Sequence, residues 1–194
     1  MAVRKQIRKY MKTITEAEVK DIIDILINSL QKAKDKSITI KSAIPIDCVT
    51  LEETSKKLRE CKFYPTLSEY KAKPVLYWIE KTSETPNEKI CDDATECDKR
   101  RKITAINKDN IDTTCLYVGK VKKGFCERIK THHGYDESGS VYGLQLCHWA
   151  TKIELALKLE VHYIVFDENM ADLMSALEAS LARDLKPLLG TRHG

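Results

Sequence analysis

The chain has 194 residues, of which 42% are hydrophobic and 32% are charged. This balance is typical of a folded globular protein and excludes a chain that is disordered over most of its length. The length suits one domain, or one domain with a small companion. The formal net charge of +4 permits a nucleic-acid partner but does not require one.

Seven cysteines are spread along the chain, and no apolar segment of a signal peptide follows the basic N-terminus. We therefore expect a cytoplasmic protein with reduced thiols, most of them buried as small hydrophobic side chains. Cys91 and Cys97 are spaced more widely than the usual zinc knuckle, and no second close pair accompanies them, so we expect no zinc site. No apolar run approaches membrane-spanning length, so we expect no membrane partner.

The N-terminal region begins with a basic stretch, residues 1–12, which we interpret as a solvated end in preference to an arm that contacts phosphates. A helix is predicted next, because Thr15 and Glu18 form the capping-box pattern and apolar residues then recur at helical spacing. Residues 37–49 alternate like a strand, and Pro45 suggests an edge or a bend.

A second helix is predicted over residues 51–61, capped by Thr50 with Glu53 and ending near Phe63–Pro65. Together with the preceding elements, it makes residues 1–70 an N-terminal α/β extension. Such an extension could recognise sequence, mediate dimerisation or bind a partner.

Residues 74–81 predict a strand that is opened by a proline. Residues 82–112 then read as a long solvated insertion between two strands, with strand character in KITAI at 102–106. The insertion contains KRRK at 99–102, for which a charged loop and a phosphate contact are about equally favoured, since loops beside strands often carry sites.

Residues 114–121 predict the second strand of this part, followed by a helix from Gly124 to about His133 whose inner face carries Phe125 and Ile129. We expect His133 itself to be exposed. Polar, glycine-flanked residues 134–140 predict a loop.

The remaining elements are strands predicted at 141–150 and 159–167, and a last helix that begins near 167–169. The apolar stripe of this helix places Glu178 at its edge, and the helix runs into KPLLG.

The order of these elements resembles the GIY-YIG nuclease superfamily over about residues 74–190. The segments that carry the resemblance are VLYWI at 75–79, LYVG at 116–119, ERIKTHH at 127–133 and EASLARDLKPLLG at 178–190. The first motif lacks the leading glycine, and the asparagine that the family often has near the end of its domain is absent after KPLLG.

The resemblance implies an α+β domain over residues 71–194, with a small mixed or antiparallel sheet flanked by helices and the insertion at about 82–112. It also implies a metal-dependent endonuclease that hydrolyses phosphodiester bonds. The substrate most consistent with it is double-stranded DNA, and the cofactor Mg²⁺ or Mn²⁺.

The resemblance assigns a role to each candidate residue. Tyr77 and Tyr117 would face each other on adjacent strands, Tyr77 deprotonating or orienting the attacking water and Tyr117 holding the phosphate or the base. Arg128 would form a fork onto the scissile phosphate, and His132 would hydrogen-bond a tyrosine or a phosphate oxygen. Glu178 would hold the metal.

Gly119, Lys120 and Lys122 are assigned to substrate binding, Gly119 because it lets the backbone turn close to the substrate. Taken singly, the candidates also have ordinary structural explanations, as strand aromatics, a solvated arginine and a boundary glutamate. The alternative functions are a catalytically silent nucleic-acid-binding module on the same fold and a protein-interaction module. A homodimer would let one site per chain cut both strands.

Overall fold

The computed structural model describes residues 15–35, 40–51, 56–97, 101–136, 140–152 and 154–190. The chain divides into two compact units, Met1–Ser37 and Ile38–Gly194. Within the described ranges, no helix combines the length and the apolar character that crossing a lipid bilayer requires.

The first unit contains helix α2 (Glu16–Asp35), which begins at the predicted capping box. The Thr15 N–H donates to Glu18 Oε2 at 2.9 Å, and the Glu18 N–H donates to Thr15 Oγ1 at 3.3 Å. These bonds satisfy two N–H groups at the start of the helix, which confirms the predicted cap. None of the side chains of α2 is buried.

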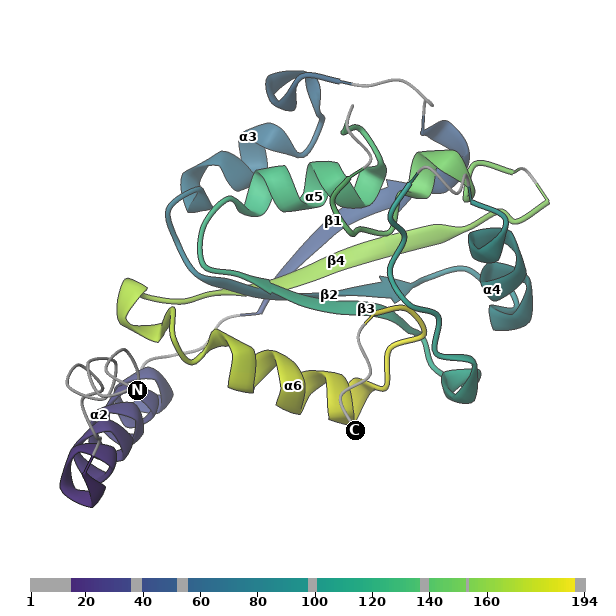
Figure 1. The fold of residues 1–194 in the computed structure, drawn as a ribbon. Coiled ribbons are helices and arrows are strands. Elements are labelled where there is room, and N and C mark those ends of the chain that lie inside the picture. Colours follow the sequence, from purple (N-terminus) through teal and green to yellow (C-terminus); the bar gives the residue numbers. More distant parts are fainter. Residues whose placement is uncertain are drawn as a thin grey trace, which may run out of the picture. The chain divides into compact units, whose positions relative to one another are not determined.

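The second unit contains a four-stranded antiparallel sheet with strand order β1-β4-β2-β3 (Figure 1). The strands are β1 (Lys41–Asp47), β2 (Val75–Lys81), β3 (Cys115–Val121) and β4 (Lys158–Val165). They confirm the α+β class and the strands predicted at 37–49, 74–81, 114–121 and 159–167. Pro45 lies in the edge strand β1, where a residue without an N–H is tolerated.

Strand β1 pairs with β4 and so joins the same sheet as β2 and β3. Residues 38–70 therefore belong to the same unit as the rest of the described sheet, and the division in the structure follows Ser37. The boundary expected from the sequence lay near residue 70.

Helices α5 (Phe125–His133) and α6 (Met174–Leu185) lie on opposite faces of the sheet (Figure 1). On the α5 face, the rings of Tyr77 and Phe125 have centroids 5.2 Å apart. On the α6 face, Trp78 and Val118 pack in a small cluster with side chains of α6. Because successive side chains of a strand point to opposite faces, neighbouring residues of β2 and β3 contact different helices.

The helix predicted over residues 51–61 is wrong where the structure describes it. Residues 52–55 lie outside the described ranges, Lys57 is extended, and only a 3-10 helix, η3 (Leu58–Glu60), follows. The next helix is α3 (Tyr64–Leu67), and Pro65 stands in its first turn, where a missing N–H costs nothing. The proline therefore opens a helix instead of ending one.

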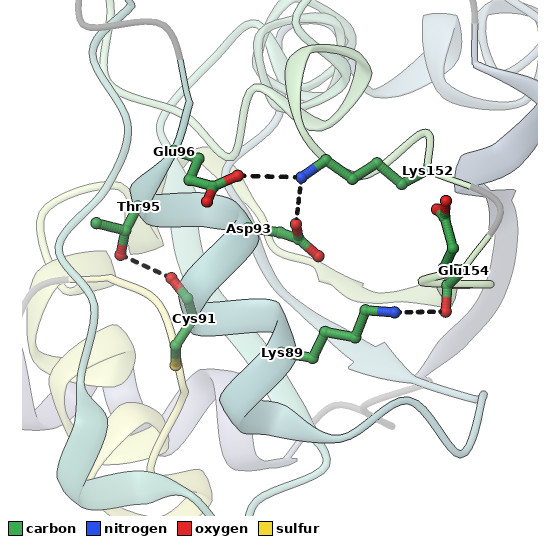
Figure 2. A network of polar contacts seen from close by, with 7 residues as sticks. All are labelled: Lys89, Cys91, Asp93, Thr95, Glu96, Lys152 and Glu154. Carbon is green, nitrogen blue, oxygen red and sulfur yellow. Dashed lines mark hydrogen bonds and ion pairs between the residues drawn. The ribbon is translucent and has the colours of Figure 1, made fainter.

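The predicted insertion contains a helix, α4 (Asn87–Thr95), whose inner face is buried at Ile90 and Ala94. The prediction of a solvated loop is therefore wrong for residues 87–95. Polar contacts fasten α4 to a later segment, as Figure 2 shows. Lys152 Nζ binds the carboxylates of Asp93 and, at 3.2 Å, Glu96.

In place of the strand expected at 102–106, the structure has two isolated β-bridges, one formed by Ile103 and one by Ile106.

Residues 141–150 do not form the predicted strand. Gln145 has a positive φ of 56°, and the 3-10 helix η6 (Leu146–His148) follows it. The apolar side chains from Leu144 to Ala150 are buried, but turns and a 3-10 helix carry them in place of a strand. The last helix also begins later than expected, at Met174, after the 3-10 helix η7 (Glu168–Met170).

Candidate active site

Four of the predicted site residues converge on the α5 face of the sheet. Tyr77 comes from β2, Tyr117 from β3, and Arg128 and His132 from α5. We call these four residues the tyrosine–arginine cluster. The antiparallel register pairs Tyr77 with Gly119, which places both tyrosines on one face with ring centroids 6.1 Å apart. The predicted proximity of the two tyrosines on adjacent strands is therefore present.

Arg128 connects the cluster through three hydrogen bonds. Its Nε donates to Tyr77 Oη at 3.0 Å, one terminal nitrogen donates to Tyr117 Oη at 2.8 Å, and the other donates to the Tyr142 carbonyl at 2.5 Å. A guanidinium carries five N–H donors. The three described bonds leave one N–H on each terminal nitrogen, which is the pair that a bidentate phosphate contact uses.

His132 has a tautomer that its neighbours define. The Leu144 N–H donates to His132 Nδ1 at 3.2 Å, so Nδ1 is the acceptor nitrogen. In a neutral ring Nε2 then carries the proton and donates to Tyr77 Oη at 2.8 Å. Burial holds the pKa of His132 well below its ordinary value, and the positive charge of Arg128 lowers it further, so the ring is neutral at pH 7.

Tyr77 is completely buried and accepts two hydrogen bonds, from Arg128 and His132. Burial raises its pKa well above the ordinary value of a tyrosine, Tyr117 raises it further, and Arg128 opposes both. The phenol is therefore protonated in the free protein at neutral pH. The N–H groups of Arg128 and His132 that donate to Tyr77 are nonetheless placed to stabilise a phenolate.

Gly119 lies inside strand β3 and not at a turn, which corrects the reason given for it above. A Cβ at this position would lie 2.5 Å from Tyr77 Oη and 2.6 Å from Tyr117 Cε1. Since these distances are far below van der Waals contact, only glycine leaves room for both rings. Gly124, at the start of α5, and Gly134, at its end, are among the glycines with a positive φ, and Gly119 is not.

Glu178 lies on α6 and is separated from the cluster by the sheet. Its Oε2 is 3.8 Å from Lys120 Nζ, and the Lys120 ammonium also donates to Ser175 Oγ at 2.8 Å. The negative charge of Glu178 still contributes, as the smallest cause, to the raised pKa of Tyr77. The strand neighbours Gly119 and Lys120 thus face the cluster and Glu178 respectively.

Lys122, the other lysine assigned to substrate, is paired with Asp172 at 2.7 Å. Both side chains are largely exposed, so the pair adds little to stability. Lys120 and Lys122 therefore both lie beside acidic side chains of the segment that carries α6.

The donor set near Glu178 fits one kind of metal only. Within the described ranges, no three His, Cys, Asp or Glu side chains are grouped to hold an ion. A single carboxylate suits a hard cation such as Mg²⁺, which keeps several waters and takes further oxygens from a phosphate. It does not suit zinc, which takes three or four protein ligands.

His133, expected to be exposed, is buried beside the rings of Phe63 and Tyr135, with centroids at 4.9 and 5.4 Å. Its Nδ1 lies 2.9 Å from the Ile129 carbonyl and donates to it when protonated. Burial lowers the pKa of His133 to about 4. This histidine belongs to the core and not to the candidate site.

The segment after α6 covers part of strand β3. The N–H groups of Leu188 and Leu189 donate to the carbonyls of Cys115 and Leu116. The buried Asn107 side chain, from the insertion, donates to the carbonyls of Pro187 and Gly190 at 3.0 and 3.3 Å. An asparagine from the insertion thus contacts the segment KPLLG. The asparagine that the GIY-YIG family often has near the end of its domain is absent after this segment.

All seven cysteines are buried, which confirms the burial predicted for most of them. Their environment is apolar, and burial raises the pKa of Cys115 to about 12 and that of Cys126 to about 11. Neither is a reactive thiolate at neutral pH.

Comparisons with protein-family models, with curated proteins and with solved structures found no match for this chain.

Proposed function

We propose that the chain is a metal-dependent endonuclease that hydrolyses phosphodiester bonds in DNA, with a catalytic domain of the GIY-YIG type. The observation that carries the proposal is the hydrogen-bonded convergence of Tyr77, Tyr117, Arg128 and His132. The motifs that resemble the family are separated in the sequence, and each is weak alone. The side chains of the first three motifs form one cluster, in which the described hydrogen bonds leave two N–H donors of Arg128 beside two tyrosine hydroxyls.

Hydrolysis adds water to phosphorus and breaks the bond to the leaving sugar oxygen, so one proton leaves the water and one joins the leaving group. We assign the first transfer to Tyr77, whose phenolate would be stabilised by N–H groups of Arg128 and His132. Arg128 would bind the phosphate and offset charge in the transition state. Tyr117 would hold the phosphate or the base.

Glu178 is the residue that would hold Mg²⁺ or Mn²⁺. When bound, the ion would supply positive charge that stabilises the phosphate oxygens and lowers the pKa of a nearby phenol or water. This charge matters for Tyr77, because burial keeps the phenol protonated in the free protein.

A catalytically silent nucleic-acid-binding module is the second candidate. The observations that favour it are the pairing of Glu178 with Lys120 and the complete burial of Tyr77. In that function, Arg128 and the lysines would bind phosphates without cleavage.

The test is cleavage of supercoiled plasmid with Mg²⁺ or Mn²⁺, compared with EDTA. We expect the wild type to cut only with metal, and Glu178→Gln to lose at least about 10²-fold in rate, the loss typical of one transition-state contact. The matched control is Asp172→Asn, a nearby exposed carboxylate paired with Lys122, and its rate should be unchanged.

Each other outcome has a definite meaning. A wild type that binds duplex DNA with a steep salt dependence but never cuts it supports the silent module. Equal rates for Glu178→Gln and the wild type refute the metal assignment. A wild type that neither binds nor cuts nucleic acid refutes both functions.

A further inference from the structure

Tyr142 is an exposed aromatic residue that is fixed beside the cluster. Its side chain is 60% exposed, while its carbonyl accepts the 2.5 Å hydrogen bond from Arg128. Lys102 Nζ lies 5.5 Å from the centroid of the ring, a cation–π geometry. A flat, accessible ring and an ammonium group thus lie next to the guanidinium that we assign to a phosphate.

Backbone pairing determines where these two side chains lie. Gly143 forms a parallel bridge with Ile103, the Gly143 N–H donates to the Lys102 carbonyl at 3.1 Å, and the Thr104 N–H donates to the Gly143 carbonyl at 3.2 Å. The next residue, Leu144, donates to His132. Tyr142 and Lys102 are therefore held by the segments that also contact the cluster, and not by flexible tails.

The chemistry of this pair matches a nucleotide. An aromatic side chain stacks on the face of any base, and a neighbouring lysine attracts the phosphate next to it. Lys102 belongs to the basic run KRRK, for which a phosphate contact was one of two sequence interpretations. An ordinary exposed tyrosine also needs no partner, but Tyr142 is itself the residue whose carbonyl accepts a hydrogen bond from Arg128.

We propose that Tyr142 and Lys102 bind the nucleotide adjacent to the phosphate held by Arg128, Tyr142 stacking on an unstacked base and Lys102 pairing with the neighbouring phosphate. The proposal rests on the proposed function to the extent that the ligand is nucleic acid. It adds that part of the substrate is single-stranded or distorted where it meets Tyr142, because a base inside a regular duplex cannot stack on a side chain.

The experiment measures binding of a fluorescein-labelled single-stranded oligodeoxynucleotide by anisotropy, in EDTA, at several salt concentrations. Tyr142→Leu should weaken binding about 10-fold or more without changing the slope against salt. Tyr142→Phe should regain most of the affinity, since the ring does the stacking. Lys102→Met should reduce the slope of log affinity against log salt concentration by about one, because one phosphate contact is lost.

The controls are Val49→Ala, which truncates another exposed apolar side chain, and Lys89→Met, which removes a lysine that donates to the Glu154 carbonyl. Thermal melting of each variant identifies loss of fold, which a 60% exposed side chain should not cause. A merely structural role would not reproduce the two expected salt dependences of binding, which are unchanged in Tyr142→Leu and reduced in Lys102→Met.

The outcomes separate this inference from the proposed function. A wild type that cuts plasmid while Tyr142→Leu binds like Val49→Ala refutes the nucleotide contact alone. A wild type that binds through Tyr142 but does not cut refutes the nuclease and keeps the contact. If Tyr142→Leu weakens the binding of duplex and of single-stranded DNA by the same factor, the inference that Tyr142 stacks on an unstacked base is refuted.

Discussion

Arg128→Lys tests the centre of the candidate site. The sequence alone allowed a solvated arginine, for which this change would alter stability by less than about 0.5 kcal/mol. The structure leads to a different expectation, because Arg128 donates to Tyr77, Tyr117 and the Tyr142 carbonyl at once. A lysine ammonium is a point donor and cannot span three acceptors that a planar guanidinium reaches.

The magnitude follows from the bonds that lysine must give up. If lysine keeps one of the three, two charge-assisted bonds are lost, each contributing about 1.5–3 kcal/mol. We expect the free energy of unfolding to fall by about 3–6 kcal/mol, and Tm to fall by about 6–24 °C at about 2–4 °C per kcal/mol. Turnover should fall at least about 10²-fold, because the two remaining N–H donors of Arg128 are lost as well.

Two measurements keep stability and chemistry apart. Urea unfolding gives the stability change, and single-turnover cleavage of a labelled duplex is measured at a temperature where both proteins are folded. The matched control is Arg183→Lys on α6, whose arginine is exposed and donates to Ser180 Oγ at 3.2 Å, and which should change neither quantity. Loss of stability with wild-type turnover would make Arg128 a structural anchor and end its phosphate role. No change in either quantity would refute the hydrogen-bond geometry itself.

Two further predictions concern packing and pH. Gly119→Ala should lower the free energy of unfolding by about 1–3 kcal/mol, because the new methyl group would overlap Tyr77 and Tyr117, and an unchanged urea midpoint would contradict this. Because burial lowers the pKa of His133 from 6.5 to about 4, its contribution to stability is complete above pH 6.5 and is lost as the pH falls to 4. The stability difference between wild type and His133→Gln should therefore shrink by about 3 kcal/mol over that range in urea unfolding, and a difference independent of pH would show that the histidine is not buried in its neutral form.

The elements that were predicted correctly are those with a local cause. The capping box at Thr15 and the strands β2, β3 and β4 follow from neighbouring residues in the sequence. Helix α5 is equally local, since Gly124 opens it and its inner face has helical spacing. Once β2, β3 and α5 exist, the approach of Tyr77 and Tyr117 to Arg128 follows from the antiparallel pairing and the face that α5 covers.

The errors have long-range causes. Helix α4 was missed because its acidic sequence looks solvated, although Ile90 and Ala94 are one helical turn apart and bury its inner face. His133 looked exposed because the rings that cover it, Phe63 and Tyr135, come from other segments. Residues 141–150 are rich in apolar side chains that suit a buried strand, and nothing in their sequence signals the positive φ at Gln145.

Part of the site lies in groups that no sequence motif records. The Tyr142 carbonyl binds Arg128, and the Leu144 N–H determines the tautomer of His132. Any residue could supply these backbone groups, so only the path of the chain identifies them. The pairing of Lys120 with Glu178 is likewise a contact between strand and helix that spacing alone could not reveal.

The position of β3 at the edge of the sheet links the two halves of the candidate site. Leu188 and Leu189 cover this edge at Cys115 and Leu116, so the rest of the edge begins at Tyr117. Beyond that point, Gly119 faces the cluster on one side of the sheet, and the next residue, Lys120, meets Glu178 on the other. A phosphate that contacts both Arg128 and an ion on Glu178 must therefore lie at this edge, beside Gly119. The proposed chemistry thus requires the substrate backbone to pass around β3, which a substrate lying only on the α5 face could not do.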